Sequence, residues 1–498
     1  MAIPMKRVLA RRQTILIVTL MAIYMVVFTV FTIGRYVRYN ATGWDLGIFT
    51  QLTWNAAHGR FLHNTIAEQN NMLGVHSPYI TILLAPLMWL WADPRTLLIV
   101  QTLILGAGAW PIAQLARRMF TQWWMAVFFA ALWLLYPALG WINRWDFHEI
   151  APAATSFAFA FEAADRRAWR QTDVWLVLAL LCKEEIGLNV AAFAVYMAWR
   201  YHRQRRTCAA WFVVGMAWFI GHAFIIFPTL REGHNTMPIH AVRYEWFLSG
   251  DPRQIWDFLS GPVFRLKIRY LIELFAPLAF VPLADPVALI PALPTFALST
   301  LSSHEQQGSM YLHHNAPVIP ALVVAAMFGL AWLSRRFTHG LGIGVGVLTA
   351  ASLLMWAMYN PIFGSSEKSS VYGWEAGAHV NALNEVRTMI PDGACVVAEN
   401  NIQAHYSVRA ETYVIGARGS GPVGDGDGCA YMIVDLGDRR FDDFAVGEAV
   451  ACYQFWSQKR APIYFRDTVV VLEWMPADPD PAAWQQMNAY CAAYAGGS

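Results

Sequence analysis

The stretch "TILIVTLMAIYMVVFTVFTIG" (residues 14–34) decides the class of this protein, because it is an apolar run without a charged residue. About 20 apolar residues in a helix cross the hydrocarbon core of a bilayer. The run is longer than the apolar core of a signal peptide, and "RYVRYNATG" after it offers no small-residue cleavage site. The basic residues Lys6, Arg7, Arg11 and Arg12 precede it. By the positive-inside bias we expect an uncleaved first span that leads to an outer loop.

The apolar character continues along the chain. Of the 498 residues, 57% are hydrophobic and 14% are charged, against about 25% charged in a typical soluble protein. Further apolar runs lie near 77–92, 96–116, 122–140, 150–163, 174–200, 208–228, 270–300, 315–334 and 340–359. We therefore predict a mainly α-helical, polytopic membrane protein with about 10 to 13 membrane segments. The net charge of +2, without a compact basic tract, gives no support for nucleic-acid binding.

The sequence changes in character near residue 366. Apolar strand-like runs then alternate with helix-like segments, as in "ACVVAENN", "AYMIVDLG", "RDTVVVLEW" and "PAAWQQMNAYCAAYA". This alternation predicts a small α/β domain over 366–498, after a membrane domain over 1–362 whose first outer loop covers about 35–76. Four of the six cysteines, at 395, 429, 452 and 491, fall in this domain. If the domain lies outside the cytoplasm, they fit one or two disulfides of open connectivity.

The first outer loop carries an acidic residue, Asp45, in "GWDLGIFTQLTWNAAHGRF" (residues 43–61). The spacing of Leu46, Ile48, Phe49, Leu52 and Trp54 predicts an amphipathic helix in the membrane interface, with Trp44 and Trp54 as anchors. Asp45 is then either the N-cap of that helix or a functional carboxylate, and its spacing fits both roles.

Four other segments place ionisable groups beside or within apolar runs, where charge is costly unless it is used or paired. They are "VHSP" (75–78), "NRWDFHE" (143–149), "KEE" (183–185) and "HHNAP" (313–317). The candidate binding residues are His76, Arg144, Asp146, His148, Lys183, Glu184, Glu185 and His314. The alternatives are structural: a polar cap before a helix for 75–78, an interfacial loop for 143–149, a cytoplasmic loop between two short helices or a Lys–Glu pair for 183–185, and a solvated loop before 313.

The histidines can bind a phosphate, relay a proton or ligate a metal. The sequence shows no tight metal-ligand spacing, so a divalent metal is compatible with it but is not indicated, and no other cofactor is implied. No G-x-S-x-G or H-E-x-x-H motif stands out, which leaves serine hydrolysis without support. "GSGPVG" (residues 419–424) matches G-x-G-x-x-G, but it lies in a Gly-rich stretch that has no Lys-Ser/Thr ending and no strand–helix setting for a phosphate loop, so it gives no support for soluble-nucleotide chemistry.

Several of these segments carry a family resemblance. The stretches "WDLGIFTQLTWNAAHGRF", "HSPYITILLAPL", "DPRTLLIVQTL", "DFHEIA", "KEEIGL", "HHNAPVIP" and "AENNIQAHYSVR" resemble bacterial predicted membrane proteins that are grouped under a domain of unknown function. The resemblance runs over essentially the whole chain. That family is similar to the GT-C superfamily of polyprenyl-phosphate-dependent glycosyltransferases, which share a many-span body and an acidic residue in the first outer loop. Asp45 matches this acidic position, where the superfamily has its catalytic base.

The resemblance implies transfer of a sugar from a polyprenyl-phosphate donor to a glycan, lipid or protein acceptor at the outer face of the membrane. Asp45 is then the general base, and a single carboxylate base without a second nucleophile implies inversion at the anomeric carbon. No other residue carries over from the superfamily; the remaining candidate residues are expected to bind substrate because of their charge and their place in the segments quoted above. The implied location is the bacterial inner membrane, among membrane lipids, with the C-terminal domain outside the cytoplasm. Two other classes stay open: a transporter or flippase, and a non-catalytic envelope assembly protein.

Overall fold

The computed structural model describes residues 2–67, 69–202, 205–231, 241–363, 377–415, 428–437, 444–457, 459–474 and 480–497. It divides into two compact units. The helical unit comprises Met1–Phe31, Leu73–Ile80 and Ile99–Val371, and the mixed unit comprises Thr32–Met72, Thr81–Leu98 and Tyr372–Ser498. The division into domains 1–362 and 366–498 stays a prediction, and its boundary adjoins residues 364–376, which lie outside the described residues.

Helices account for most of the described chain. The α-helices are α1 (Ala2–Tyr36), α2 (Ile48–Ala57), α3 (Ile80–Leu84), α4 (Pro86–Leu90), α5 (Arg95–Ala107), α6 (Ala109–Met119), α7 (Met125–Leu134), α8 (Pro137–Arg144), α9 (Ala151–Asp165), α10 (Trp169–Leu180), α11 (Ile186–Tyr201), α12 (Arg205–Gly221), α13 (Phe227–Leu230), α14 (Glu245–Leu248), α15 (Pro252–Ser260), α16 (Pro262–Phe275), α17 (Leu293–Leu301), α18 (Val318–Arg336), α19 (Gly340–Tyr359), α20 (Ala378–Met389), α21 (Asn400–Gln403), α22 (Phe444–Trp456) and α23 (Pro481–Gly497). The π- and 3₁₀-helical turns are η1 (Gly43–Gly47), η2 (Met72–Gly74), η3 (His222–Ile226), η4 (Ala241–Tyr244), η5 (Ala276–Leu278), η6 (Val281–Ala284), η7 (Pro286–Ala292), η8 (Glu305–Gln307), η9 (His313–Asn315) and η11 (Ala404–Tyr406).

Among the described residues, five helices are long and apolar enough to cross a membrane: Leu9–Tyr36, Arg95–Met119, Arg205–Leu230, Val318–Arg336 and Gly340–Tyr359. A sixth candidate is the pair α7 and α8, which is bent by 44°. Pro137 at the start of α8 explains the bend, because proline lacks the N–H that would continue a helix. Shorter apolar helices cover Ile80–Leu90 and Pro286–Leu301. The prediction of a polytopic α-helical membrane protein is confirmed.

The outward faces of several spans are apolar. Val26 on α1, Val213 on α12 and Ile343 on α19 are all more than 60% exposed. A contiguous apolar surface of this kind is unstable in water, whereas lipid tails cover it without cost. These faces are therefore the lipid-facing surfaces of the helical unit.

The interior of the helical unit depends on close helix packing. In α18 every residue from Val318 to Ala331 is buried. Helices α11 and α12 approach through glycines, because a Cβ on Gly215 would lie only 2.8 Å from the backbone nitrogen of Ala191. Small residues permit this approach, which van der Waals contacts favour in a membrane.

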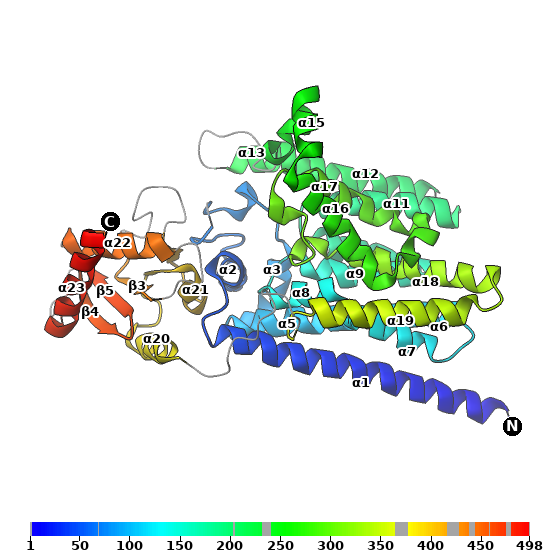
Figure 1. The fold of residues 1–498 in the computed structure, drawn as a ribbon, viewed down its shortest axis with the longest axis horizontal. Helices are drawn as coiled ribbons and strands as arrows, with labels where there is room; N and C mark the ends of the chain where they lie inside the picture. The colour runs from blue at the N-terminus through cyan, green and yellow to red at the C-terminus, as the bar shows by residue number, and fades with distance from the viewer. Residues whose placement is uncertain are drawn as a thin grey trace. The chain divides into compact units, whose positions relative to one another are not determined.

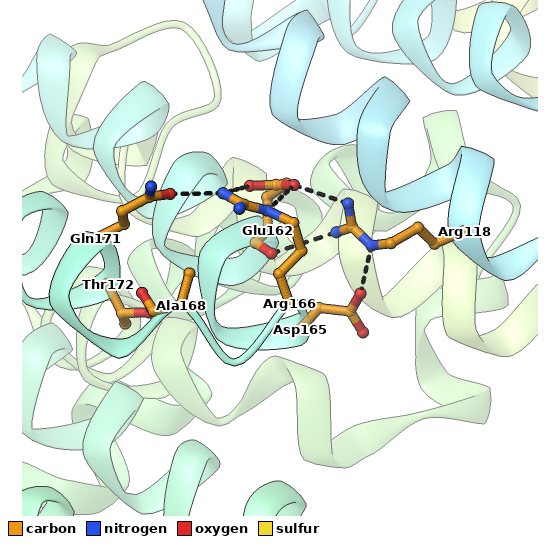
Figure 2. Close-up of polar contacts among 7 residues, drawn as sticks. All are labelled: Arg118, Glu162, Asp165, Arg166, Ala168, Gln171 and Thr172. Atoms are coloured by element: carbon orange, nitrogen blue, oxygen red, sulfur yellow. Dashed lines mark hydrogen bonds and ion pairs between the residues drawn. The ribbon is translucent and has the colours of Figure 1, made fainter.

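A charged network joins the ends of α6 and α9 (Figure 2). Arg118 on α6 donates to the carboxylates of Glu162 at 2.7 Å and Asp165 at 2.8 Å. Arg166 also donates to Glu162 at 2.7 Å and reaches the Gln171 side chain at 2.6 Å. Because two guanidiniums share one buried carboxylate, this network fixes the helix ends, and it explains the basic residues at these positions as structural groups.

The mixed unit contains a five-stranded sheet in the order β2-β1-β3-β5-β4. The strands are β1 (Val396–Ala398), β2 (Thr412–Val414), β3 (Tyr431–Asp435), β4 (Arg460–Arg466) and β5 (Val469–Trp474). β1 is parallel to β2 and β3, whereas β5 is antiparallel to β3 and β4. The predicted C-terminal α/β domain is confirmed in its strand content, although the sequence did not indicate the two edge strands, β2 and β4.

The two faces of the sheet support separate cores. Val397 and Val434 pack with residues of α22 and α23, such as Phe455 and Met487. Val396, Ala398 and Ile433 pack on the opposite face with residues of α20. Figure 1 shows the sheet between α20 on one side and α22 with α23 on the other. This alternation follows from the two-residue period of a strand, and it produces a three-layer α/β/α arrangement.

The four C-terminal cysteines form two disulfides, Cys395–Cys429 and Cys452–Cys491. The second links α22 to α23 over a sequence separation of 39 residues. Cys182, in the loop after α10, and Cys208, on α12, are buried free thiols, as expected of small apolar side chains.

We predict that the Cys452→Ser/Cys491→Ser variant loses stability. Opening a loop of this length is expected to lower the free energy of unfolding by about 4 kcal/mol, because the unfolded chain gains conformational freedom. The full-length protein in detergent, followed by proteolysis across a denaturant series, measures the change. Cys208→Ser, a cysteine replacement in the helical unit, is the control and should leave the unfolding midpoint of the segment that contains α22 and α23 unchanged. An unshifted midpoint in the double variant would contradict the pairing.

The first outer loop differs from its predicted form. Helix α2 begins at Ile48, and Gln51, Leu52 and Asn55 on its different faces are all buried within the mixed unit. Gln51 accepts a hydrogen bond from the backbone of Thr65 at 2.8 Å, and its amide donates to the Thr65 hydroxyl at 2.9 Å. The prediction of an interfacial amphipathic helix is therefore wrong: the polar side chains that would face water instead form internal hydrogen bonds.

Candidate functional site

A histidine–glutamate pair joins two of the predicted ionisable segments, 75–78 and 183–185. His76 precedes Pro78 and helix α3, and Glu184 lies in the loop between α10 and α11. His76 Nδ1 lies 2.9 Å from Oε1 of Glu184. The second oxygen of Glu184 accepts from the Ser77 backbone N–H at 3.1 Å and from its hydroxyl at 3.4 Å. Glu184 is 3% exposed, so this carboxylate holds His76 in one orientation.

A second buried pair lies beside the first. Lys183 Nζ is 3.4 Å from Oε1 of Glu149, and both side chains are almost completely buried. Oε2 of Glu149 is also buried and has no hydrogen-bond partner in the part of the chain that the structure describes. The sequence left two readings for the charges of 183–185, a charged site within a span and a loop between two short helices, and the structure places them in the loop that joins α10 to α11. Because Lys183 and Glu184 lie in a loop, their side chains can reach Glu149 and His76, which lie in two other loops.

Three histidines lie together beside these pairs. The rings of His148 and His313 are stacked, with centroids 3.6 Å apart, and the His314 ring lies 4.2 Å from that of His313 at a tilt of 49°. Gln101 on α5 fixes the His148 loop, because it accepts from the His148 N–H at 2.9 Å and donates to the Asp146 carbonyl at 2.9 Å. The four loops thus meet as one group of ionisable side chains, which we call the ionisable cluster: His76, His148, Glu149, Lys183, Glu184, Glu185, His313 and His314.

The surroundings of this cluster determine its protonation. Burial, together with His148, His314 and Lys183, holds the pKa of His313 well below its usual value. Burial, Lys183 and His148 do the same to the pKa of His314. Burial raises the pKa of Glu185, although Lys183 opposes this effect. At neutral pH His313 and His314 are therefore uncharged and can each both donate and accept one hydrogen bond.

These lowered pKa values predict acid lability. Below about pH 6.5, His313 and His314 bind protons in the unfolded chain but not in the native protein. The free energy of unfolding therefore decreases as the pH is lowered. The slope reaches about 1.4 kcal/mol per pH unit for each histidine. Thermal unfolding in detergent between pH 8 and pH 5 should show a smaller loss for His313→Asn/His314→Asn than for the wild type.

His405 supplies the control for this experiment. Its pKa is also lowered by burial and by Arg387, but it belongs to the mixed unit. His405→Asn should remove the loss of stability at low pH that is due to His405. The loss that is due to His313 and His314 should remain. Equal pH profiles for the wild type and the His313/His314 variant would contradict the assignment.

Arg144 and Asp146 lie on the segment that carries His148. Arg144 Nη1 donates to the Pro361 carbonyl at 2.7 Å, and its guanidinium lies over the Trp141 ring at 5.0 Å. Asp146 is 1% exposed, and its backbone carbonyl accepts from Gln101. Arg144 therefore anchors the end of α8, and Gln101 holds the backbone at Asp146.

Asp45 belongs to the mixed unit and lies within the π-helical turn η1. π-Helical turns are rare in proteins as a whole, but those that occur are often found at functional sites. Oδ2 of Asp45 accepts from the Thr42 hydroxyl at 3.1 Å, and its side chain is partly exposed. The N-cap of α2 is Gly47 rather than Asp45, so the capping role is wrong.

The Asp45 turn packs closely against the C-terminal part of the same unit. The Trp44 N–H donates to the side-chain oxygen of Asn400 at 3.0 Å. A Cβ on Gly43 would lie 2.7 Å from Oε1 of Gln403, and one on Gly47 would collide with the same atom. The segment "AENNIQAHYSVR" is therefore explained as the support of this turn, and the glycines on both sides of Asp45 permit the contact.

Sequence reasoning did not select three members of this arrangement: Glu149, His313 and Gln101. The first two were adjacent to selected histidines, so their position in the same charged segments was a usable signal. Gln101 lies inside an apolar helix and gave no signal, because its role depends on a loop that is 47 residues further along the chain. No group of three or more His, Cys, Asp or Glu residues suited to a metal ion is present among the described residues.

The fold is similar to that of a known glycosyltransferase. Two crystal structures of ArnT from Cupriavidus metallidurans, bound to undecaprenyl phosphate and in the apo state, match with TM-scores of 0.52 and 0.53. Their sequence identities are 13% and 12%; each match covers 93% of this chain, and 99% and 98% of the ArnT chains. ArnT is a GT-C glycosyltransferase, so the predicted GT-C-like fold is confirmed. No curated protein matches the sequence.

The model of the family described as "Predicted membrane protein (DUF2079)" matches residues 35–423, which is more than half of the chain. This range contains the Asp45 turn and the whole ionisable cluster. The chain belongs to the DUF2079 family of predicted membrane proteins.

Proposed function

We propose that this protein is a membrane glycosyltransferase of the GT-C type, which transfers a sugar from a polyprenyl-phosphate donor to an acceptor at the outer face of the membrane. The observation that carries the proposal is the similarity of the fold, over 93% of the chain, to a crystal structure of ArnT that is bound to undecaprenyl phosphate. The Asp45 turn and the ionisable cluster support it, because they provide a carboxylate base and polar substrate contacts. Fold alone does not imply activity.

In the proposed reaction Asp45 is the general base. The acceptor hydroxyl gives its proton to the Asp45 carboxylate while its oxygen forms a bond to the anomeric carbon. The bond between that carbon and the phosphate oxygen breaks, and its electron pair leaves with the polyprenyl phosphate. One carboxylate acting as a base, without a second nucleophile, leads to inversion at the anomeric carbon. The partly exposed side chain of Asp45 supports this role.

The donor would be held by the residues that the sequence selected: His76, Arg144, Asp146, His148, Lys183, Glu184, Glu185 and His314. The inner membrane of a bacterium is the proposed location, with the C-terminal domain outside the cytoplasm. The two disulfides support this orientation, because they form in oxidising compartments and are rare in the cytosol. The acceptor is a glycan, a lipid or a protein.

The test is a transfer assay on the purified full-length protein in sealed vesicles. The probe is a polyprenyl-phosphate hexose that is radiolabelled in the sugar, presented with bacterial envelope glycans, lipids and proteins as acceptors. We expect a labelled acceptor and an equal amount of released polyprenyl phosphate. Movement of the intact donor between leaflets without a labelled product would overturn the proposal and favour a flippase.

A further inference from the structure

We propose that the ionisable cluster binds the uncharged, hydroxyl-bearing ring of a sugar, and that it selects against sugars that carry a negative charge. This inference rests on the proposed function and assigns one part of the donor to this cluster. Four histidines and a lysine would first suggest that the cluster binds a phosphate group. Two observations favour a neutral sugar ring over a phosphate: the position of the carboxylates and the chemistry of the atoms that have no hydrogen-bond partner.

The charges of the cluster do not suit an anion. Lys183 is opposed by Glu149, and Glu184 and Glu185 also act on it electrostatically. When all four are ionised, this lysine and the three glutamates have a formal charge of −2, and burial raises the pKa of Glu185. Arg243 acts on His314 at the edge of the cluster, and its guanidinium donates to Gln307 at 3.0 Å. A phosphate or carboxylate placed among these glutamates would meet like charge, which is unfavourable in a buried site.

The unpartnered atoms indicate what the ligand must supply. Oε2 of Glu149 and Nδ1 of His313 are buried without a hydrogen-bond partner in the described ranges. A carboxylate oxygen only accepts hydrogen bonds, so its partner must be a donor. The phosphodiester of the donor has acceptor oxygens alone, whereas each sugar hydroxyl both donates and accepts. A hydroxylated ring can therefore satisfy both atoms, and leaving them unpaired would be costly.

The cluster also has an accessible edge. The side chain of His76 is 21% exposed, and Glu185, His313 and His314 are partly exposed. Behind this edge lie Glu149, Lys183 and Glu184, each at most 4% exposed. A ligand that enters from the edge would reach fixed groups, because Ser77 holds Glu184 and Gln101 holds the His148 loop. Preorganised polar groups of this kind give discrimination between ligands that differ in one charge.

The test compares two donors with the same polyprenyl phosphate, one carrying glucose and the other glucuronic acid. Transfer rates and binding to the full-length protein in lipid nanodiscs are measured separately. We expect the wild type to favour the glucose donor at least tenfold, in binding and in kcat/KM. Glu149→Gln, which removes a charge at constant size, should reduce this preference at least fivefold. Glu184→Gln should reduce it as well, and binding of polyprenyl phosphate alone verifies that each variant is folded.

Glu385→Gln is the matched control, because Glu385 is 48% exposed in the mixed unit and pairs with Arg466. It should keep the wild-type preference. Equal use of both donors by the wild type, or an unchanged preference in both variants, would overturn this inference while transfer itself upholds the proposed function. Charge-selective binding without transfer to any acceptor would have the opposite meaning: the sugar site would stand and the proposed reaction would fail.

Discussion

Replacement of Asp45 by asparagine is expected to reduce sugar transfer by roughly 10²- to 10⁴-fold, the usual contribution of a general base. Asparagine has nearly the same size, and its amide oxygen can still accept from the Thr42 hydroxyl, which lies 3.1 Å from the carboxylate. It cannot accept the acceptor's proton. Binding of the polyprenyl-phosphate donor should stay within about twofold, because the lost function concerns the acceptor hydroxyl.

Single-turnover transfer and donor binding in nanodiscs measure these two effects separately. Thr42→Val serves as a matched variant, because it removes the hydroxyl contact but leaves the carboxylate. We expect it to cost less than about tenfold in rate, in line with the loss of one hydrogen bond. An Asp45→Asn protein that keeps more than about a tenth of the wild-type rate would exclude Asp45 as the base.

Replacement of Lys183 by methionine is expected to lower the free energy of unfolding by about 3 to 5 kcal/mol, because it leaves a buried carboxylate without its counter-charge. Lys183 and Glu149 lie 3.4 Å apart, with exposed side-chain fractions of 5% and 2%. The Lys183→Met/Glu149→Gln double variant should recover a large part of this loss, since the unpaired charge is then also removed. Thermal or denaturant unfolding of the four proteins in detergent gives the interaction energy as a double-mutant cycle.

The exposed pair of Arg466 and Glu385 provides the comparison. Its nitrogen and oxygen lie 3.0 Å apart, but the two side chains are 61% and 48% exposed. Breaking it with Arg466→Met should cost less than about 1 kcal/mol, because water and salt screen such pairs. A Lys183→Met protein as stable as the Arg466→Met protein would show that the Glu149 carboxylate is not held as a buried charge.

The class of the protein and the strands of its C-terminal domain follow from local sequence pattern. The run over 14–34 lies within α1, and the apolar runs near 396, 432 and 470 are β1, β3 and β5. The edge strand β4 was not predicted, because it contains Pro462 and has an arginine at each end. The other edge strand, β2, is as short as β1, but it is not buried along its whole length as β1 is, and so it lacks the continuous apolar run of β1. Edge strands bury less surface, so their sequences show the alternating pattern weakly.

The Asp45 loop shows where local pattern misleads. Its apolar spacing is genuinely helical, and α2 is present, but Gln51 and Asn55 on its polar face are as buried as Leu52. A prediction from periodicity assigns every polar side chain of a helix to the side that faces water. Only the folded chain shows that the Thr65 backbone satisfies Gln51 instead, and that Asp45 lies inside η1 rather than at the N-cap of α2.

By itself the sequence determined the membrane class, the α/β pattern of the C-terminal segment and the segments in which charge is concentrated. These properties depend on how neighbouring residues partition between lipid, water and a local core, which is a property of short stretches. The tertiary structure alone decided which charges meet. His76 and Glu184 are 108 residues apart in the chain, and Glu149 reaches Lys183 from a different loop. Pairing depends on the distance between side chains in space, and the packing of helices with apolar faces sets that distance.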